Sequence, residues 1–362
     1  MNAEPEILIV GAGPSGLAAA LFLSQEGLHP RIIEKNDGLS LHSKALGVNP
    51  RTLLLLEQSG LTKRFLDNGR KMEKINFWKG NQLVFQNDLT KVRHKYQFML
   101  IQPQMESERM LLEELVNRKV EVEFGTAFQS ISHSNDHLNT VISTPRGYSV
   151  EHPYRLVVGA DGARSKVREL SGIKTSGFRY EEEWELYDIQ LDVPRQANEG
   201  HVVIMEEGGI VMIRLKEDIW RVAGNIKELL NHLPKNTKVG KIVWQSTFKI
   251  SHRVAVELFR DKVLLIGDAA HLHSPVGARG MNLGIEDAYI ISQLIKEDSI
   301  NTYTSIRQDY LMRTVRRINA MTQGLGGSNF LLRKVRANIT FLKPLFPLAM
   351  PIARKFILGL NK

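Results

Sequence analysis

The amino terminus carries the feature that most constrains this chain, a glycine-rich turn between two short apolar runs. Residues 6–10 (EILIV) have the composition of a buried parallel strand, and the turn GAGPSG follows at residues 11–16. A stretch of helical composition comes next, and residues 31–34 (RIIE) are a second predicted strand that ends on an acidic residue. This order of strand, turn, helix, strand and acid is what a dinucleotide-binding βαβ unit requires. The alternative is a glycine turn with a structural role only.

Each glycine of this turn has its own physical reason in such a unit. Gly11 allows the tight turn, Gly13 lets the backbone approach a pyrophosphate, and Gly16 lets helix and strand pack closely. Glu34 is placed to accept hydrogen bonds from a ribose diol. The predicted cofactor-binding residues of this unit are Gly11, Gly13, Ser15, Gly16, Glu34 and Lys35.

A second run places a Gly-Asp pair at the end of an apolar strand. Residues 264–266 are apolar, Gly267 and Asp268 follow, and a Pro- and Gly-rich turn leads to a helix that should begin near Met281. This arrangement puts a carboxylate near a sugar-like chain and a helix amino terminus near an electron-rich group. An anionic reduced flavin would be such a ligand. The predicted contacts are Gly267, Asp268, Pro275 and the backbone of Gly280, Met281 and Asn282.

A third run lies between these two in the sequence. Residues 155–159 are a predicted strand, and Asp161 and Gly162 follow in a turn before a short basic helix. Such a run can bind a cofactor through its turn. Alternatively, it is an ordinary turn whose aspartate caps the helix.

Together the three runs resemble the group A flavoprotein monooxygenases, the FAD-dependent aromatic hydroxylases of the para-hydroxybenzoate hydroxylase fold. The resemblance covers roughly residues 5–300. It implies that the glycine turn and Glu34 bind FAD and that the Asp161-Gly162 motif serves both FAD and NAD(P)H. It also implies that Asp268 contacts the ribityl and pyrophosphate region of FAD.

Two further segments extend the resemblance. Residues 43–48 (SKALGV) resemble the family's segment beside the isoalloxazine ring, which adds Lys44 to the predicted contacts, and Gln102 resembles the glutamine that meets the ribityl chain. Lys44 stands where arginine is usual, which keeps a cation but loses the planar fork. Arg279 stands where glutamine is common.

The activity that the resemblance implies is hydroxylation of an aromatic (phenolic) or related hydrophobic substrate with NADH or NADPH and O₂, through a C4a-hydroperoxyflavin. The cofactor does this chemistry, so no catalytic side chain is expected, and Pro275 is expected near the flavin ring. An alternative is a reductase or oxidase of the same fold that acts on a lipid or isoprenoid. A second alternative is a flavin-binding regulatory module without turnover.

The predicted fold class is α/β, with a Rossmann-like FAD-binding domain interleaved with a mostly antiparallel substrate-domain sheet and a helical carboxyl-terminal tail. The expected FAD-binding segments are 1–70, 100–174 and 260–300, the substrate segments are 71–99 and 175–259, and the tail is 301–362. A hairpin is expected around Gly80, antiparallel strands over residues 137–158, and one helix over residues 226–233.

The second sheet supplies the candidates for substrate contact, which are Trp184, Tyr187, Met205, Met212 and Arg214. The four apolar or aromatic ones line a hydrophobic pocket or are simply core. Arg214 and the nearby Arg221 bind a substrate carboxylate or, as is commoner, are exposed strand arginines.

No metal site is expected. The chain has no cysteine, which excludes disulfides, thiolate metal sites and a redox-active dithiol. His271 and His273 lie two positions apart after Asp268, a poor metal spacing outside a strand, so packing and backbone hydrogen bonding are favoured for both.

The charge is distributed unevenly along the chain. Of 48 Lys and Arg, ten lie between residues 310 and 362, where there is no Asp or Glu, so the rest of the chain is nearly balanced. A neutral body without a nucleic-acid-binding motif argues against nucleic acid. The basic, apolar segment 326–362 suits peripheral contact with anionic lipid, and the alternative is a packed tail with a solvated basic face. A cytoplasmic location is expected, because no secretory signal or 18-residue apolar stretch is seen.

Overall fold

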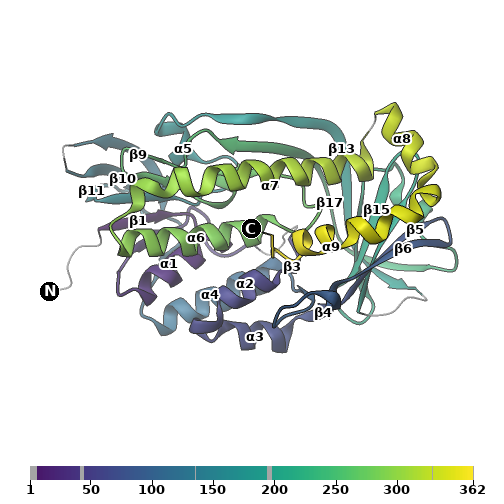
Figure 1. Ribbon diagram of the computed structural model, residues 1–362. Coiled ribbons are helices and arrows are strands. Elements are labelled where there is room, and N and C mark those ends of the chain that lie inside the picture. Colours follow the sequence, from purple (N-terminus) through teal and green to yellow (C-terminus); the bar gives the residue numbers. More distant parts are fainter. Residues whose placement is uncertain (1–5, 41–44, 135, 194–197, 328, 362) are drawn as a thin grey trace.

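A parallel sheet and a larger, mainly antiparallel sheet lie side by side in the computed structural model, which describes residues 6–40, 45–134, 136–193, 198–327 and 329–361 (Figure 1). The parallel sheet has the order β18 (Phe259–Arg260), β19 (Val263–Leu265), β12 (Leu156–Gly159), β1 (Ile7–Val10), β2 (Arg31–Ile33) and β8 (Val122–Glu123). Only β18 pairs antiparallel with its neighbour. The central strands β1 and β12 of this parallel sheet are buried at every position, as expected of a parallel sheet covered on both faces.

The larger sheet is built from strands that are far apart in the sequence. Its order is β20 (His271–Leu272), β17 (Lys238–Ala255), β13 (Thr175–Asp192), β16 (Ile219–Gly224), β15 (Gly209–Arg214), β14 (Glu199–Ile204), β5 (Lys74–Lys79) and β6 (Gln82–Asp88). All neighbours are antiparallel except β14 and β5. The hairpin predicted around Gly80 is confirmed as β5 and β6, and it is continuous with the strands of residues 175–255.

Two long strands join the regions of the molecule. β13 and β17 pair first over residues 175–179 and 251–255, and then, past an irregularity, over residues 183–192 and 238–249. Figure 1 shows them running across the molecule from the side of the parallel sheet to the far end of the larger one. The larger sheet is therefore an extension of the framework that begins beside the parallel sheet.

Two small sheets complete the strands. One is β9 (Ala127–His133), β10 (Leu138–Ser143) and β11 (Ser149–Tyr154), and the other is β3 (Gly47–Val48), β7 (Met99–Ile101) and β4 (Arg70–Met72). The predicted antiparallel pairing over residues 137–158 is confirmed for β10 and β11. It is wrong for β12, which joins the parallel sheet because all four of its side chains are apolar or small and buried.

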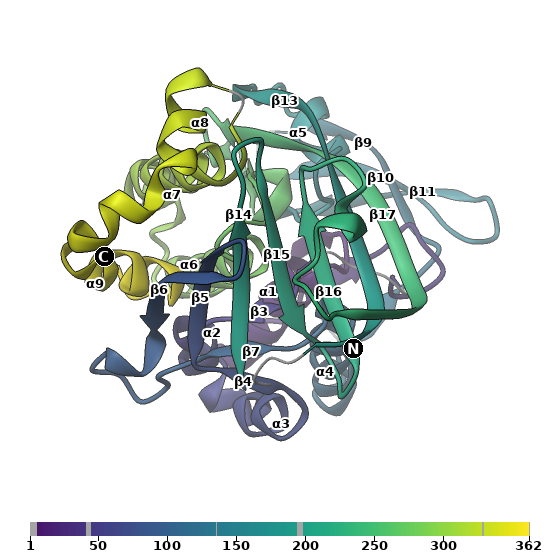
Figure 2. The same cartoon turned by 90° about the vertical axis from the view of Figure 1, so that its right-hand side faces the viewer.

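The helices lie on the parallel sheet and along the edge of the larger one. They are α1 (Pro14–Gln25), α2 (Pro50–Leu55), α3 (Leu61–Asn68), α4 (Gln104–Asn117), α5 (Lys166–Leu170), α6 (Gly280–Lys296), α7 (Tyr303–Gly326), α8 (Phe330–Ala337) and α9 (Phe346–Ile357). Figure 2 shows α7, α8 and α9 grouped on one side, beside β14, β5 and β6. The predicted α/β class with a helical carboxyl-terminal region is confirmed. Within the described residues, none of these helices combines the length and the apolar character needed to cross a bilayer.

The helix predicted over residues 226–233 is wrong in extent. Only a 3₁₀ turn forms, over Leu229–His232. Glu228, immediately before it, takes a left-handed conformation with φ of 51°, and Pro234 follows it. A left-handed residue at one end and a proline at the other leave no room for a regular α-helix.

Candidate functional site

The glycine turn after β1 is shaped by two glycines that the protein itself requires. Gly11 has a φ of +104°, and a Cβ at this position would lie 2.5 Å from the carbonyl oxygen of Ala160. A Cβ at Gly16 would lie 1.9 Å from the carbonyl oxygen of Gly11. Both positions are therefore restricted to glycine by internal contacts, as the tight turn and the close helix–strand packing of the motif demand.

Gly13 differs from its two neighbours in the motif. Its φ of −73° is open to any residue, and a Cβ built on it meets no atom within 4 Å. It forms the amino-terminal cap of α1, where no side chain satisfies the first N–H groups. The protein has no internal reason for glycine here, so the free space and the unsatisfied N–H groups fit an external anionic group such as a pyrophosphate.

Ser15 joins the first motif to the Gly-Asp motif. A Cβ on Gly267 would lie 2.2 Å from the Ser15 Oγ, and a Cβ on Gly284 would lie 2.1 Å from the same atom. The first turn of α1 therefore contacts both the turn after β19 and the helix α6. Motifs separated by more than 250 residues in the sequence thus meet at the carboxyl ends of β1 and β19.

Glu34 lies where the sequence predicts, directly after β2. Its Oε2 accepts a hydrogen bond from the backbone N of Ala12 at 2.9 Å, and its Oε1 accepts one from the backbone N of Asn36 at 3.0 Å. The carboxylate is therefore held at the glycine turn. Lys35 beside it is exposed, and Lys44 lies outside the described residues.

Asp161 connects the third motif to the same place. Its Oδ2 accepts hydrogen bonds from the backbone N of Lys166 at 2.7 Å and of Val167 at 3.1 Å, whereas its buried Oδ1 has no partner within the described part of the chain. Arg168 of the following helix donates to the carbonyl oxygen of Ala269 at 2.8 Å. The helix-capping role is therefore real, and one carboxylate oxygen still remains for another group.

Gln102 is buried directly after β7. Its Nε2 donates to the Oγ of Ser107 at 2.9 Å, and its Oε1 has no partner among the residues that the structure describes. Buried polar atoms are almost always hydrogen-bonded, so an orphaned amide oxygen beside a predicted cofactor site indicates a missing donor. A ribityl hydroxyl is a donor of the right kind.

The amino terminus of α6 is the other open feature of this edge. α6 begins at Gly280, one residue from the predicted start, and no side chain caps it. The preceding Gly277 and Ala278 both have positive φ, 89° and 51°, and Pro275 of the same turn is exposed. A non-glycine residue held in a left-handed conformation is a strain that proteins keep mainly at functional positions. We call Gly13, Gln102, Asp161 and the first turn of α6 the open rim.

Asn282 contributes more than the backbone N–H that the sequence predicts. Its Oδ1 accepts from the backbone N of Asn49 at 2.9 Å and from the Oγ1 of Thr52 at 2.7 Å. Its Nδ2 donates to the carbonyl oxygens of Gly47 and Ala278, both at 2.7 Å. The side chain thus fastens α6 to the segment that precedes α2, a role that sequence reasoning missed.

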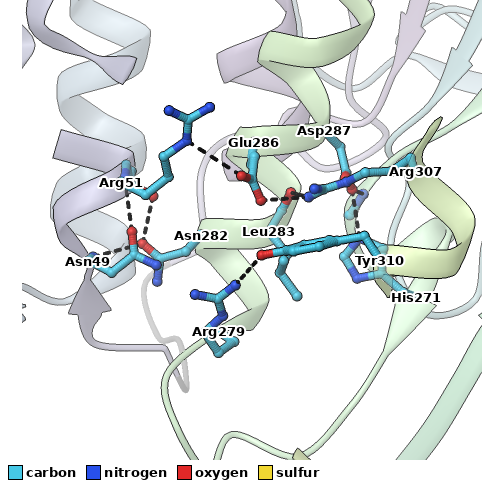
Figure 3. A network of polar contacts seen from close by, with 12 residues as sticks. Asn49, Arg51, His271, Arg279, Asn282, Leu283, Glu286, Asp287, Arg307 and Tyr310 are labelled. Carbon is cyan, nitrogen blue, oxygen red and sulfur yellow. Dashed lines mark hydrogen bonds and ion pairs between the residues drawn. The ribbon is translucent and has the colours of Figure 1, made fainter. Parts of the chain in front are cut away.

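Helices α6 and α7 and the turn after β19 bring together a set of largely buried charged residues that sequence reasoning also missed (Figure 3). Asp287 of α6 accepts from the backbone N of Gly267 at 3.1 Å, and the same Oδ2 lies 2.6 Å from the Nε2 of His271. Its Oδ1 accepts from the Nε of Arg307 at 2.7 Å, and Arg307 also pairs with Glu286 at 2.8 Å. We call His271, Glu286, Asp287 and Arg307 the buried junction.

Electrostatics keep Asp287 and Arg307 of the buried junction charged. Burial acts to raise the pKa of Asp287, but the nearby Arg307 and His271 outweigh it and hold that pKa below its ordinary value. Burial likewise acts to lower the pKa of Arg307, and the carboxylates of Asp287 and Glu286 raise it. Asp287 therefore stays ionised and fixes the backbone of Gly267, the residue before Asp268. Asp268 itself is exposed, between the buried Gly267 and Ala269 in a 3₁₀ turn.

The two histidines after Asp268 differ in their partners. His271 is buried, as expected, but its partner is a carboxylate rather than the backbone. The Nδ1 of His273 lies 2.9 Å from the carbonyl oxygen of Ser274, which agrees with the predicted backbone bonding. Arg279, at the amino-terminal cap of α6, is 1% exposed and donates to the Tyr310 hydroxyl at 2.9 Å and to the carbonyl oxygen of Phe356.

The predicted substrate residues do not share one face of the larger sheet. Trp184 packs in a cluster with Val202, Ile204 and Val276, the last from the turn that precedes α6. Tyr187, Met205 and Met212 pack in a different cluster around Trp220. Because side chains alternate along a strand, Trp184 and Tyr187 point to opposite faces.

Arg214 and Arg221, the two arginines of the larger sheet, differ in their partners. Arg214 is half-buried, bonds to the carbonyl oxygens of Lys216 and Glu217, and lies with its guanidinium 5.8 Å from the centre of the Trp220 ring. The expectation of an exposed strand arginine is wrong for Arg221, which is 7% exposed and pairs with Asp188 at 2.7 Å. Asp188 lies directly opposite it on β13, a pairing that only the sheet register creates.

Comparisons with known proteins agree with this geometry. Residues 4–317 match the family described as FAD binding domain. The 6-methylpretetramide 4-monooxygenase of Streptomyces rimosus is 28% identical and matches 99% of this chain and 69% of its own length. The pentachlorophenol 4-monooxygenase of Sphingobium chlorophenolicum is 27% identical and matches 90% of this chain and 66% of its own length. The chain spans between 55% and 69% of the length of these and other curated relatives.

Solved structures share the fold at lower identity. The p-nitrophenol 4-monooxygenase of Pseudomonas putida DLL-E4 has a TM-score of 0.84 at 22% identity and covers 98% of this chain and 97% of its own. A ternary complex of aklavinone-11 hydroxylase with FAD and aklavinone has a TM-score of 0.80 at 20% identity and covers 90% of this chain and 70% of its own. The chain therefore belongs to the FAD-binding domain family, within the group A FAD-dependent aromatic monooxygenases that its motifs resemble.

Proposed function

We propose that this protein uses NADH or NADPH and O₂ to hydroxylate a phenolic or related hydrophobic aromatic molecule. The observation that carries the proposal is the open rim, where, among the described residues, Gly13 leaves free space and buried oxygens of Gln102 and Asp161 have no partner. This free space and these two buried oxygens belong to motifs that resemble the family's FAD-binding motifs. Relatives named as monooxygenases of pentachlorophenol and 6-methylpretetramide support an aromatic substrate.

In this proposal the open rim and its neighbours bind and orient FAD. Gly13 gives room to the pyrophosphate, Glu34 accepts from a ribose hydroxyl, and the Oε1 of Gln102 accepts from the ribityl chain. Asp268 and Asp161 supply carboxylate acceptors beside them. The uncapped N–H groups of α6 stabilise negative charge on the ring. Bound FAD would supply electron transfer from the nicotinamide and activation of O₂.

The substrate in this proposal lies against the sheet face that carries Trp184. Its cluster includes Val276, next to Pro275 in the turn before α6. Apolar side chains there exclude water from the reacting ring and require no acid–base pair. Met212 and Tyr187, on the opposite face, are assigned to packing instead.

The test is an assay of NADH and NADPH oxidation by the purified holoprotein, with and without a panel of phenols. We expect one or more phenols to raise the oxidation rate and to yield a hydroxylated product with one atom from ¹⁸O₂. Hydrogen peroxide is measured in parallel, because uncoupled turnover also consumes the nicotinamide.

The assay separates the rival functions. Reduction of a lipid or isoprenoid double bond without incorporation of oxygen would assign a reductase, and peroxide alone with every phenol would favour an oxidase. Retention of FAD without any oxidation of NADH or NADPH would assign a binding module.

A further inference from the structure

Helix α9 is apolar on two opposite faces. Phe346, Met350 and Ile357 follow one another at helical spacing on the inner face, and the Phe346 ring lies 3.9 Å from that of Phe85 on β6. Leu348 and Ile352, on the outer face, are 76% and 71% exposed. A helix that is apolar all round is normally covered on all sides, so the outer face of α9 indicates a partner.

The same exposure extends over the segment before α9. Nine large apolar side chains among the described residues are at least 57% exposed, and six of them lie between residues 330 and 352. These six, which we call the apolar ridge, are Phe330, Leu331, Phe341, Leu345, Leu348 and Ile352. The other three are scattered singly over the rest of the chain, which is normal for a surface.

The apolar ridge is presented by a well-fastened segment. Arg336 of α8 is 2% exposed and donates to the carbonyl oxygens of Glu206, Gln323, Gly324 and Gly327. At the other end Phe356 and Ile357 are buried. Both ends of the segment are thus held by the body, while its outer side chains project from it. Figure 2 shows α8 and α9 on the outer side of the molecule.

Cations are interspersed with the apolar ridge. Lys334, Lys343 and Lys355 are exposed, and residues 310–362 contain no Asp or Glu. Arg333 is partly neutralised, because it lies 3.4 Å from Glu206 and 3.8 Å from Glu207. The three lysines have no acidic residue within their own segment, so the ridge presents a net positive apolar surface.

This charge distinguishes between possible occupants. In a symmetric dimer the same patch faces itself, so a contact through the ridge would bring the lysines of the two copies together. Juxtaposed like charges oppose association. An anionic bilayer matches both the apolar side chains and the lysines of this surface. It buries apolar side chains at the headgroup boundary and attracts lysines to its surface.

We propose that residues 330–355 bind the surface of an anionic lipid bilayer, with the apolar ridge in the interface and Lys334, Lys343 and Lys355 at the headgroups. Binding is peripheral, and it requires no rearrangement of the buried contacts of Arg336. The inference goes beyond the proposed function and does not rest on it, because it is tested by binding alone.

The experiment is co-sedimentation of the full-length holoprotein with phosphatidylcholine vesicles, with or without about 30% phosphatidylglycerol. We expect binding to the anionic vesicles, much weaker binding to pure phosphatidylcholine, and weakening by salt as the charges are screened. Replacing Lys334, Lys343 and Lys355 together by Gln should weaken binding about 100-fold, since each cation contributes about fivefold.

A second triple variant tests the apolar contribution. Phe341→Ser, Leu348→Ser and Ile352→Ser together should weaken binding by about 100-fold or more, because three large apolar side chains no longer enter the interface. The matched control is Val116→Ser, Tyr148→Ser and Val243→Ser, which removes three comparably exposed side chains elsewhere and should leave binding unchanged. FAD content and secondary structure, measured for every variant, should match the wild type.

Three results would overturn the proposal. The first is no binding to either vesicle, or equal binding to both. The second is a control variant that loses as much binding as the ridge variant. The third is a wild-type dimer in sedimentation velocity that the ridge variant converts to a monomer, which would assign the surface to a second copy.

Discussion

The buried junction and the open rim lie at the same edge of the parallel sheet, yet they treat polar groups in opposite ways. In the junction, Asp287 and Arg307 are almost fully buried and each has two or more partners within the protein. In the rim, Gln102 and Asp161 each keep a buried oxygen without a partner among the described residues, and Gly13 faces open space there. We infer that the difference separates residues that the fold requires from residues that the proposed cofactor requires. Substitutions in the two regions should therefore change different measured quantities.

The largest effect is expected in the buried junction. Asp287→Asn removes the charge between Arg307 and His271, and breaking such a buried pair costs about 3–5 kcal/mol in the free energy of unfolding. Urea unfolding should show this loss in both the apoprotein and the holoprotein. Asp309→Asn is the control, because Asp309 pairs with Arg313 on the exposed side of α7. This variant should change the free energy of unfolding by less than about 0.5 kcal/mol. Equal effects of the two variants would contradict the assignment.

Two glycines of one loop sharpen the comparison further. Gly16→Val should destabilise the apoprotein by about 3 kcal/mol or more, because its Cβ would overlap the Gly11 carbonyl. Gly13→Val should leave the unfolding of the apoprotein nearly unchanged and still abolish FAD binding, since its side chain occupies the space left for the pyrophosphate. Fluorescence titration with FAD, together with thermal unfolding of the apoprotein, measures both. Normal FAD affinity in Gly13→Val would remove the pyrophosphate from this loop.

Acid should destabilise the protein through His252. This residue is 2% exposed, neither ring nitrogen has a hydrogen-bond partner in the described ranges of the chain, and burial lowers its pKa from 6.5 to about 4. Between these pH values the unfolded chain holds the proton and the folded protein does not, so the stability present above pH 6.5 is lost as the pH falls towards 4. The loss is about 2.5 kcal/mol between about pH 7 and about pH 4.5.

His252→Phe should flatten that pH dependence. Burial also lowers the pKa of the neighbouring His273, to about 3, so part of the dependence should remain in the variant. His29→Phe is the control, because His29 is exposed. Urea unfolding of each variant across the pH range gives the slope, and an unchanged slope in His252→Phe would refute the attribution.

The smallest of these effects should fall on the cofactor alone. If Asp268 binds FAD as proposed, Asp268→Ala should remove a charge-assisted hydrogen bond worth about 1.5–3 kcal/mol and weaken the affinity about 10- to 150-fold. Because Asp268 is exposed, the unfolding of the apoprotein should hardly change. Full FAD occupancy of this variant at low cofactor concentration would exclude Asp268 from the site.

Local patterns were sufficient to predict much of the fold and the local structure of the turns around Gly11 and Gly267. The strand–turn–helix runs around Gly11 and Gly267 place apolar residues and glycines within a few positions of each other, so their structures follow from nearby sequence alone. The predicted start of α6 was one residue from the observed one.

What the sequence could not predict depends on contacts between distant segments. Arg307 meets Asp287 only because α7 packs against α6, and Arg221 is buried only because Asp188 lies opposite it in the sheet register. The prediction that Trp184 and Tyr187 line one pocket was wrong for another reason. Side chains alternate between the two faces of a strand, so residues 184 and 187 lie on opposite faces of the sheet.

Arg336 has a consequence for how the tail is to be dissected. Helix α7 ends at Gly326, and its last carbonyl groups have no partner within the helix. Arg336 reaches back and donates to the carbonyls of Gln323, Gly324 and Gly327, so the chain beyond α7 closes the end of α7 with its own side chain. Shortening the chain near Leu325 would remove Arg336 and with it these hydrogen bonds at the end of α7. It would also remove the hydrogen bonds from Arg336 to the Glu206 carbonyl. Loss of function after such a deletion would report an opened helix end, and only point substitutions on the outer side chains isolate what the tail binds.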